Sequence, residues 1–208
     1  MAEQNGNLLT IKNLSIKVGQ QQLIKDYNLE LSEGQCKGIS APTGTGKTTL
    51  FNSIAGLLPQ KAFSISGEII KCPDLKIAYA FQEPRLINGI NVIENVMLPL
   101  NNLLDKERSV SIARVWLGKL NLLNKAYEAP NMLSGGEQQR ANIARAFAYS
   151  QVLYSQKKAP CLLLLDEPFA SQDEQNALNI NSLIKEELLL PKTAALVISH
   201  DKSLLTDF

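Results

Sequence analysis

The sequence predicts an α/β fold in which a mainly parallel sheet forms the core, with an N-terminal antiparallel β subdomain and a helical subdomain attached to it. Three patterns support this prediction. The first third alternates apolar and polar residues, the middle third repeats apolar residues at helical spacing, and the last third contains uninterrupted apolar runs. Alternation is typical of half-exposed strands, whereas continuous apolar runs are typical of parallel strands that are covered on both faces.

The first third is predicted to begin with antiparallel strands. Residues 8–18 and 27–31 alternate apolar and polar side chains. A Ser-Glu-Gly turn at 32–34 then leads to a short strand over 36–40. A helix is predicted over 48–58, where Gly and Pro mark its end.

The middle and last thirds are predicted to contain helices and buried strands. Residues 106–123 place Val110, Ala113, Leu117 and Leu120 on one helical face, and residues 135–148 place Ile143, Ala144 and Phe147 at helical spacing. A helical subdomain over about 83–150 is therefore expected as an insertion in the α/β core. The apolar runs 162–165 and 194–198 are predicted to be strands of the parallel sheet.

Length and composition limit the classes of protein that need to be considered. A chain of 208 residues suits a single domain, 1–208, with 45% hydrophobic and 20% charged residues. The net charge of +1 predicts no general attraction to nucleic acid or to anionic lipid. The three cysteines lack C-x-x-C spacing, so we expect no disulfide framework, no zinc site and a reducing cytosol.

The sequence contains neither a signal-peptide pattern at its start nor a run of about 18 apolar residues that could cross a bilayer. Any work at a membrane is therefore expected to pass through a partner subunit.

The segment APTGTGKTT, residues 41–49, is predicted to bind a nucleoside triphosphate. Backbone N–H groups before a helix N-terminus can surround phosphate, and Gly44 and Gly46 allow the chain to wrap closely. Lys47 can reach the β- and γ-phosphates, and the Thr48 hydroxyl can ligate Mg²⁺. Ala41 stands where the strict pattern has glycine. A P-loop NTPase is predicted rather than a simple strand-to-helix turn, with ATP contacts from Thr43, Gly44, Thr45, Gly46, Lys47, Thr48 and Thr49.

The segment CLLLLDEP, residues 161–168, places two carboxylates at the end of a buried strand. Ligands of α/β folds bind at the carboxyl ends of the strands. We expect Asp166 to be a magnesium carboxylate and Glu167 to orient and polarise the attacking water. An acidic helix cap after a core strand is the simpler alternative, and the nearby glycine loop argues against it.

The octet LSGGEQQR, residues 133–140, is predicted to form a second anion site. Two glycines allow close approach of the backbone, and the free N–H groups at a helix start attract negative charge. Ser134 is also predicted to cap this helix, with Glu137 completing a capping box.

With these three motifs in place, nearly the whole chain resembles the ATP-binding cassette proteins. The resemblance implies that Ser134, Gly135 and Gly136 face the γ-phosphate held by an opposite subunit, so that two cassettes sandwich ATP head to tail. It also implies that Gln82 contacts Mg²⁺ and the attacking water and that His200, in VISHD, contacts the γ-phosphate. The expected catalytic residues are thus Glu167, His200 and Gln82, and the expected metal contacts are Thr48, Gln82 and Asp166.

Three features depart from the pattern of that family. Val18 stands near the position where an aromatic residue usually stacks on adenine. Gln172, in the segment ASQD, replaces an apolar residue expected near the dimer seam, while Asp173 is retained. The chain ends at Phe208, soon after His200, so we expect a short C-terminus without a regulatory domain.

The resemblance implies an ATPase subunit at the cytoplasmic face of the cell membrane. Separate transmembrane permease subunits, a second cassette in a homodimer or heterodimer, and an extracytoplasmic solute-binding protein are the expected partners, and no nucleic acid is expected. The segment FQEPRLINGINVIENVMLPL is similar to that of nitrate, sulfonate and taurine importer cassettes. An export or lipoprotein-release cassette and a soluble cassette of iron–sulfur assembly remain alternatives. Met97, Leu98 and Leu100 are predicted either to dock a permease helix or to form subdomain core.

Overall fold

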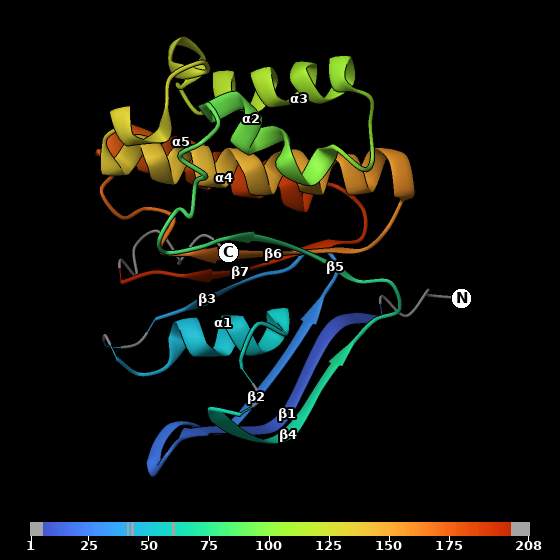
Figure 1. Cartoon of the computed structure of the whole chain (residues 1–208). Coiled ribbons are helices and arrows are strands. Elements are labelled where there is room, and N and C mark those ends of the chain that lie inside the picture. The colour runs from blue at the N-terminus through green and yellow to red at the C-terminus, as the bar shows by residue number, and fades with distance from the viewer. Residues whose placement is uncertain (1–5, 41, 43, 60, 201–208) are drawn as a thin grey trace.

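The computed structural model describes residues 6–40, 42, 44–59 and 61–200. Its elements lie in layers (Figure 1). An antiparallel sheet lies at one end, helix α1 (Lys47–Ala55) separates it from a parallel sheet, and the remaining helices cover the far face of that sheet. This is an α/β fold with a parallel core sheet and an N-terminal antiparallel sheet, as the sequence predicts.

The antiparallel sheet has the order β2-β1-β4, with β1 at Asn7–Val18, β2 at Gln21–Ser32 and β4 at Phe63–Lys71. The predicted strand 27–31 is therefore longer, because β2 continues back to the turn at Gly19. Strand β4 was not predicted. Gly67 in β4 has φ 90° and faces a bulge at Asn13, where a Cβ atom would overlap the Asn13 carbonyl. A glycine is therefore required at the point where β4 passes the bulge of β1.

The second sheet is parallel throughout, with the order β3-β7-β6-β5. Its strands are β3 (Cys36–Ile39), β5 (Lys76–Ala80), β6 (Cys161–Asp166) and β7 (Thr193–Ile198). Every residue of β6 and β7 is buried, which confirms the prediction from their apolar runs. The leucines of β6 alternate between two cores: Leu163 and Leu165 face the helices, and Leu162 and Leu164 face α1 and the antiparallel sheet. Each buried leucine stabilises the fold by about 2 kcal/mol.

The helices over the parallel sheet form two tiers. Helix α4 (Gly135–Val152) and helix α5 (Glu174–Leu188) lie nearer the sheet, and α2 (Val92–Met97) and α3 (Lys106–Lys119) pack against α4. The shorter helical turns are η1 (Leu98–Leu100), η2 (Leu123–Lys125), η3 (Pro130–Met132) and η4 (Leu153–Lys157).

Two predicted helices end earlier than expected. The helix predicted over 48–58 ends at Ala55, because Gly56 adopts a left-handed φ of 72° and caps it. The helix predicted over 106–123 ends at Lys119, because Asn121 has a φ of 56° that a helix does not allow. The predicted apolar face of this segment is confirmed, since Ala113, Leu117 and Leu120 are fully buried and Val110 is half-buried.

Candidate active site

The glycine loop joins β3 to α1, so that the start of α1 faces the carboxyl ends of the parallel strands. Gly44 and Gly46 both have left-handed φ angles, 80° and 86°. A Cβ atom on Gly46 would lie 3.1 Å from the Leu23 carbonyl oxygen, so the loop passes close to β2. The Thr45 hydroxyl and the Lys47 ammonium both donate to the Pro42 carbonyl, at 2.8 and 3.1 Å. The loop is thus wrapped in front of a helix N-terminus, where anions bind.

Three oxygen-bearing side chains meet at the first turn of α1. The Thr48 hydroxyl lies 2.8 Å from Asp166 Oδ2 and 3.5 Å from Gln82 Oε1. The other Asp166 oxygen, Oδ1, is buried and has no hydrogen-bond partner among the described residues. Burial raises the pKa of Asp166, although the Thr48 hydroxyl and the Lys47 charge oppose that shift. An unpartnered buried carboxylate oxygen beside a hydroxyl and an amide oxygen suits a magnesium ion.

Glu167 and His200 meet because β6 and β7 are neighbours in the sheet. Glu167 follows β6 with a left-handed φ of 52° and is only 8% exposed. The His200 backbone N–H donates to Glu167 Oε2 at 3.3 Å, and His200 Nε2 lies 3.1 Å from Glu167 Oε1. The imidazole is half-exposed while the carboxylate is buried. This arrangement can hold a carboxylate in a fixed direction next to the glycine loop.

These groups surround one cavity of about 220 Å³, which we call the nucleotide pocket. Most of the predicted glycine-loop and catalytic residues line it, although Ala41 and Thr43 lie outside the described residues. Thr45 lines an adjoining pocket instead. The lining of the nucleotide pocket is Leu23, Gly44, Gly46, Lys47, Thr48, Thr49, Gln82, Asp166, Glu167 and His200.

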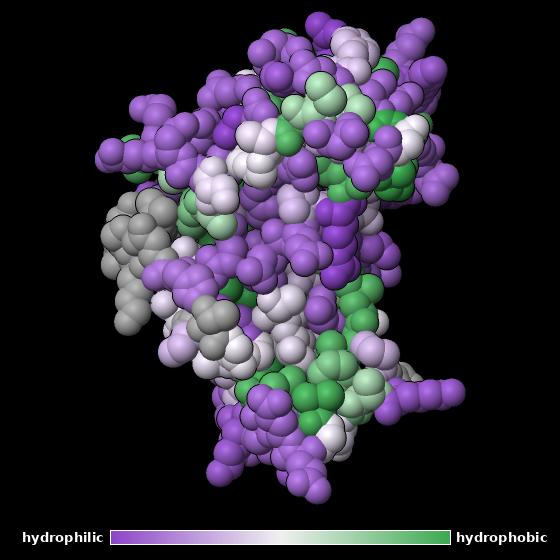
Figure 2. All heavy atoms as spheres, turned by 60° about the vertical axis from the view of Figure 1, so that its left-hand side comes forward, coloured by the Kyte–Doolittle hydropathy of each residue, from purple (hydrophilic) through white to green (hydrophobic). Residues whose placement is uncertain are grey.

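The adjoining pocket is mainly apolar and was not predicted. Leu23 lines both pockets, and Ile24, Tyr27 and Leu50 belong to the second one, whereas Val18 lines neither. Leu23 was missed because the strand was predicted to begin only at residue 27, and the segment QQLIKDY before it does not alternate apolar and polar residues. Figure 2 brings forward the left-hand side of Figure 1 and shows hydrophobic residues gathered in its lower part, at the height of the antiparallel sheet.

The octet lies at the start of α4, away from the nucleotide pocket of the same chain. Ser134 caps the helix: its N–H donates to Glu137 Oε2 at 2.8 Å, and the Glu137 N–H donates to the Ser134 hydroxyl at 3.3 Å. The predicted capping box is confirmed, and the Ser134 N–H lowers the pKa of Glu137. Ser134 and Gly135 are exposed, and a Cβ on Gly135 would meet nothing within 4 Å. The described residues therefore leave open space in front of this helix start.

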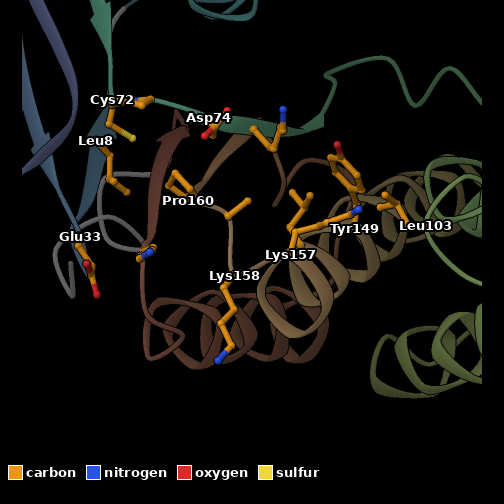
Figure 3. Close-up of a pocket in the computed structure, with 14 residues that line it drawn as sticks. Leu8, Glu33, Cys72, Asp74, Leu103, Tyr149, Lys157, Lys158 and Pro160 are labelled. Carbon is orange, nitrogen blue, oxygen red and sulfur yellow. The ribbon is translucent and has the colours of Figure 1, made fainter.

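A larger cavity, of about 670 Å³, lies at the opposite end of the parallel strands (Figure 3). Lys76, Pro160 and Lys192 line it just where β5, β6 and β7 begin. Its lysines are exposed, and Lys158 extends away from the neighbouring side chains in Figure 3. None of the buried polar atoms without a partner in the described part of the chain belongs to its lining. We therefore assign the functional site to the nucleotide pocket.

The fold and this pocket define the chain as a nucleotide-binding P-loop NTPase. Comparison with known proteins narrows this class, since the family described as ABC transporter matches residues 24–170. The chain belongs to the ABC transporter family, and it is one of the ATP-binding, ATP-hydrolysing cassettes of that family.

Individual relatives agree with this assignment. The aliphatic sulfonates import ATP-binding protein of Granulibacter bethesdensis is 31% identical over 93% of this chain and 74% of its own length. The lipoprotein-releasing system ATP-binding protein of Buchnera aphidicola is 32% identical over 88% of this chain and 82% of its own. Among solved structures, the dimeric post-hydrolysis state of an ATP-binding cassette bound to ADP and Pi superposes with a TM-score of 0.77, at 30% identity over 95% of this chain and 90% of that one.

Proposed function

We propose that residues 1–208 form a single nucleotide-binding domain, with a helical subdomain inserted at about 83–150, that hydrolyses ATP to drive solute import through separate membrane subunits. The observation that carries the proposal is the convergence of Thr48, Gln82, Asp166 and Glu167 beside the glycine loop. Carboxylates, a hydroxyl and a lysine around a phosphate-sized cavity are the groups that phosphoryl transfer requires.

In this proposal each side chain of the nucleotide pocket has one task. Lys47 binds the β- and γ-phosphates as a point charge, together with the N–H groups of the loop from Thr43 to Thr49. Thr48, Gln82 and Asp166 would hold Mg²⁺, which when bound neutralises phosphate charge. Glu167 orients and polarises the attacking water, and His200 contacts the γ-phosphate from the end of β7.

The tight contact between Glu167 and His200 supports this division of tasks. The backbone N–H of His200 fixes one carboxylate oxygen, so that the carboxylate keeps one orientation toward the loop. Because Glu167 is buried, its interaction with water is stronger than it would be in bulk solvent.

We further propose that Ser134, Gly135 and Gly136 bind the γ-phosphate held by a second cassette. Their position supports this, because the two glycines and the free N–H groups of α4 lie outside the nucleotide pocket of their own chain. Two copies arranged head to tail would bring each octet to the other's glycine loop, in a homodimer or heterodimer. The dimeric state of the similar solved cassette agrees with such an assembly.

The docking surface for a permease subunit is proposed to be a groove of about 600 Å³ between α2 and α3. Of the three residues considered from the sequence, Leu100 is fully buried and belongs to the core, whereas Met97 and the 36% exposed Leu98 line this groove. Among the described residues no helix is long and apolar enough to span a bilayer. Because the sulfonate relative is an import ATP-binding protein, we propose attachment at the cytoplasmic face of the membrane through the permease, with a solute-binding protein on the other side.

Import is favoured because the sulfonate relative is an import protein. The alternative, release of lipoproteins, is supported by the lipoprotein-releasing relative. A soluble cassette, as in iron–sulfur assembly, would use the same pocket without a membrane partner.

The decisive experiment is a pull-down of the tagged chain from a detergent extract of its native membranes. The transport proposal predicts capture of a hydrophobic subunit. Leu98→Asp should abolish this capture, whereas Leu189→Asp, at the 82% exposed Leu189 after α5, should retain it. No capture by the wild-type chain would contradict the transport proposal, and equal capture by the two variants would contradict the proposed docking surface.

A further inference from the structure

The loop that follows the catalytic carboxylate packs directly on the first turn of α4. Ser171 has a left-handed φ of 59°, which turns its carbonyl oxygen toward Gly136. A Cβ atom on Gly136 would overlap that oxygen, so only glycine allows the loop to approach so closely. Gly136, the second glycine of the octet, therefore packs against a loop of its own chain.

The side chain of Gln172 joins this loop to the helix by hydrogen bonds from both ends of its amide. Its Nε2 group donates to the Gly136 carbonyl at 3.0 Å and to the Ala170 carbonyl at 3.2 Å. Its Oε1 atom accepts from Arg140 Nη1 at 2.8 Å. An apolar residue of the same size could make none of these bonds.

Arg140 extends the connection to a third element. Its Nε group donates to the Leu120 carbonyl, at the C-terminal end of α3, at 3.1 Å. We call the chain of contacts from Gly136 through Gln172 and Arg140 to Leu120 the Gln172 bridge. It links the loop after β6, the start of α4 and the end of α3.

The same loop is held rigidly with respect to Glu167. The Ala170 N–H donates to the Glu167 carbonyl at 3.1 Å, and the Gln172 N–H donates to the Phe169 carbonyl at 3.3 Å. On the other side, Gln139 Nε2 of α4 lies 3.5 Å from the Glu167 carbonyl oxygen. The first turn of α4 is thus tied to the backbone of the catalytic carboxylate through two glutamines.

We propose that Gln172 is a positioning residue that fixes the start of the octet, where Ser134 and Gly135 are exposed, relative to Glu167 within one protomer. Ser134 and Gly135 then reach the second cassette in a direction set by the protomer's own catalytic loop. This inference rests on the proposed head-to-tail sandwich. Because the polar bridge acts within one chain, Gln172 contributes to turnover and assembly without contributing to ATP binding in the nucleotide pocket.

The test compares Gln172→Leu with Gln156→Leu, the same change at an exposed residue of η4. Gln172→Leu should lower kcat about tenfold while KM for ATP changes less than about twofold, because a small misplacement costs rate rather than binding. Gln172→Glu should also lower kcat, since its carboxylate still accepts from Arg140 but places a charged oxygen against the Gly136 and Ala170 carbonyl oxygens instead of a donor. Gln156→Leu should match the wild type. Equal kcat for Gln172→Leu and the wild type would overturn the inference.

A second measurement separates positioning from general destabilisation. In the Glu167→Gln background, ATP-dependent dimer formation is followed by light scattering, and binding of a fluorescent nucleotide is followed on the monomer. Adding Gln172→Leu should weaken dimer formation without changing nucleotide affinity. If the parent Glu167→Gln forms no dimer, the proposed function fails. If both dimerise at the same ATP concentration, only the role of Gln172 fails.

The Gln172 bridge also predicts non-additivity. Arg140→Leu and Gln172→Leu should each lower kcat, and the double variant should lose no more than the worse single one, because both remove the same connection. Additive losses would contradict a shared bridge.

Discussion

The two helix starts for which we propose phosphate binding differ in how completely other residues of the chain surround them. The glycine loop lies in a pocket whose walls come from β2, α1 and the ends of β6 and β7, and it faces buried carboxylates. The octet begins a helix with a complete capping box, which α1 lacks, yet Ser134 and Gly135 face open space among the described residues. Both are helix N-termini that attract anions. Among the described residues, only the first has beside it the side chains for which we propose magnesium binding and orientation of water.

In the proposed head-to-tail arrangement, each chain contributes its glycine loop to one ATP site and its octet to the other. The loop after Glu167 packs against Gly136, whereas Ser134 and Gly135 before it are exposed. In the proposed head-to-tail assembly, the second side of each phosphate site therefore comes from another polypeptide. The predictions below change one half-site while leaving the other intact.

The largest effect is expected for Glu167→Gln. Loss of the water-polarising carboxylate should lower kcat by about 100-fold or more, since general-base groups contribute this much. Nucleotide binding should remain, because the loop and Lys47 are unchanged, and an ATP-stabilised dimer should accumulate. Steady-state hydrolysis and size-exclusion chromatography with ATP measure both. Turnover close to the wild type would remove Glu167 from its role.

Lys47→Ala should lower the affinity of the chain for ATP. Loss of the ammonium beside the β- and γ-phosphates should weaken ATP binding about tenfold to a hundredfold, the range for a charged hydrogen bond. Calorimetry measures the change, with Lys12→Ala, an exposed lysine of β1, as the matched control. Unchanged affinity in Lys47→Ala would contradict the assignment of the pocket.

Gly136→Ala should change the octet half-site and leave the residues that bind nucleotide in the monomer unchanged. The added methyl group overlaps the Ser171 carbonyl, so the first turn of α4 must shift. We expect kcat to fall roughly tenfold with unchanged nucleotide affinity of the monomer. Gly118→Ala in α3 is the control, because a Cβ there meets nothing within 4 Å. A loss of monomer affinity in Gly136→Ala would show that the two regions are not separate.

The smallest effect is expected from a change in the recognition of adenine. Val18 provides no aromatic ring for adenine, and the adjoining pocket is lined by Leu23, Ile24 and Tyr27. Val18→Tyr should raise ATP affinity about threefold through stacking. Competition between ATP and GTP measures it, and an equal gain for any polyphosphate would indicate that the new ring does not touch the base.

Much of the fold could be predicted because its signals are local. The apolar runs of β6 and β7 and the helical spacing in α4 appear in single windows of sequence, and all were confirmed. Strand β4 could not be predicted in this way. Ile65 and Ile70 are exposed, and Gly67 interrupts the alternation, so β4 depends on its pairing with β1.

The candidate site likewise contains residues that local motifs predict and contacts that only the structure shows. Thr48, Asp166 and Glu167 lie in contiguous motifs, and parallel strands bring the ends of those motifs together. The contact of Gln172 with Gly136 joins positions 36 residues apart through one amide, and no periodicity indicates it. The sequence shows that Gln172 is unusual at its position, but only the structure shows which groups its side chain contacts.

The most direct test of the shared site is a mixing experiment. Lys47→Ala and Gly136→Ala are each purified and assayed alone, and then in a 1:1 mixture. In a head-to-tail heterodimer of the two, one glycine loop and the octet that faces it are both intact, so turnover should rise well above that of either variant. Turnover equal to the mean of the two variants at every concentration would show that each chain hydrolyses ATP by itself, and would contradict the account.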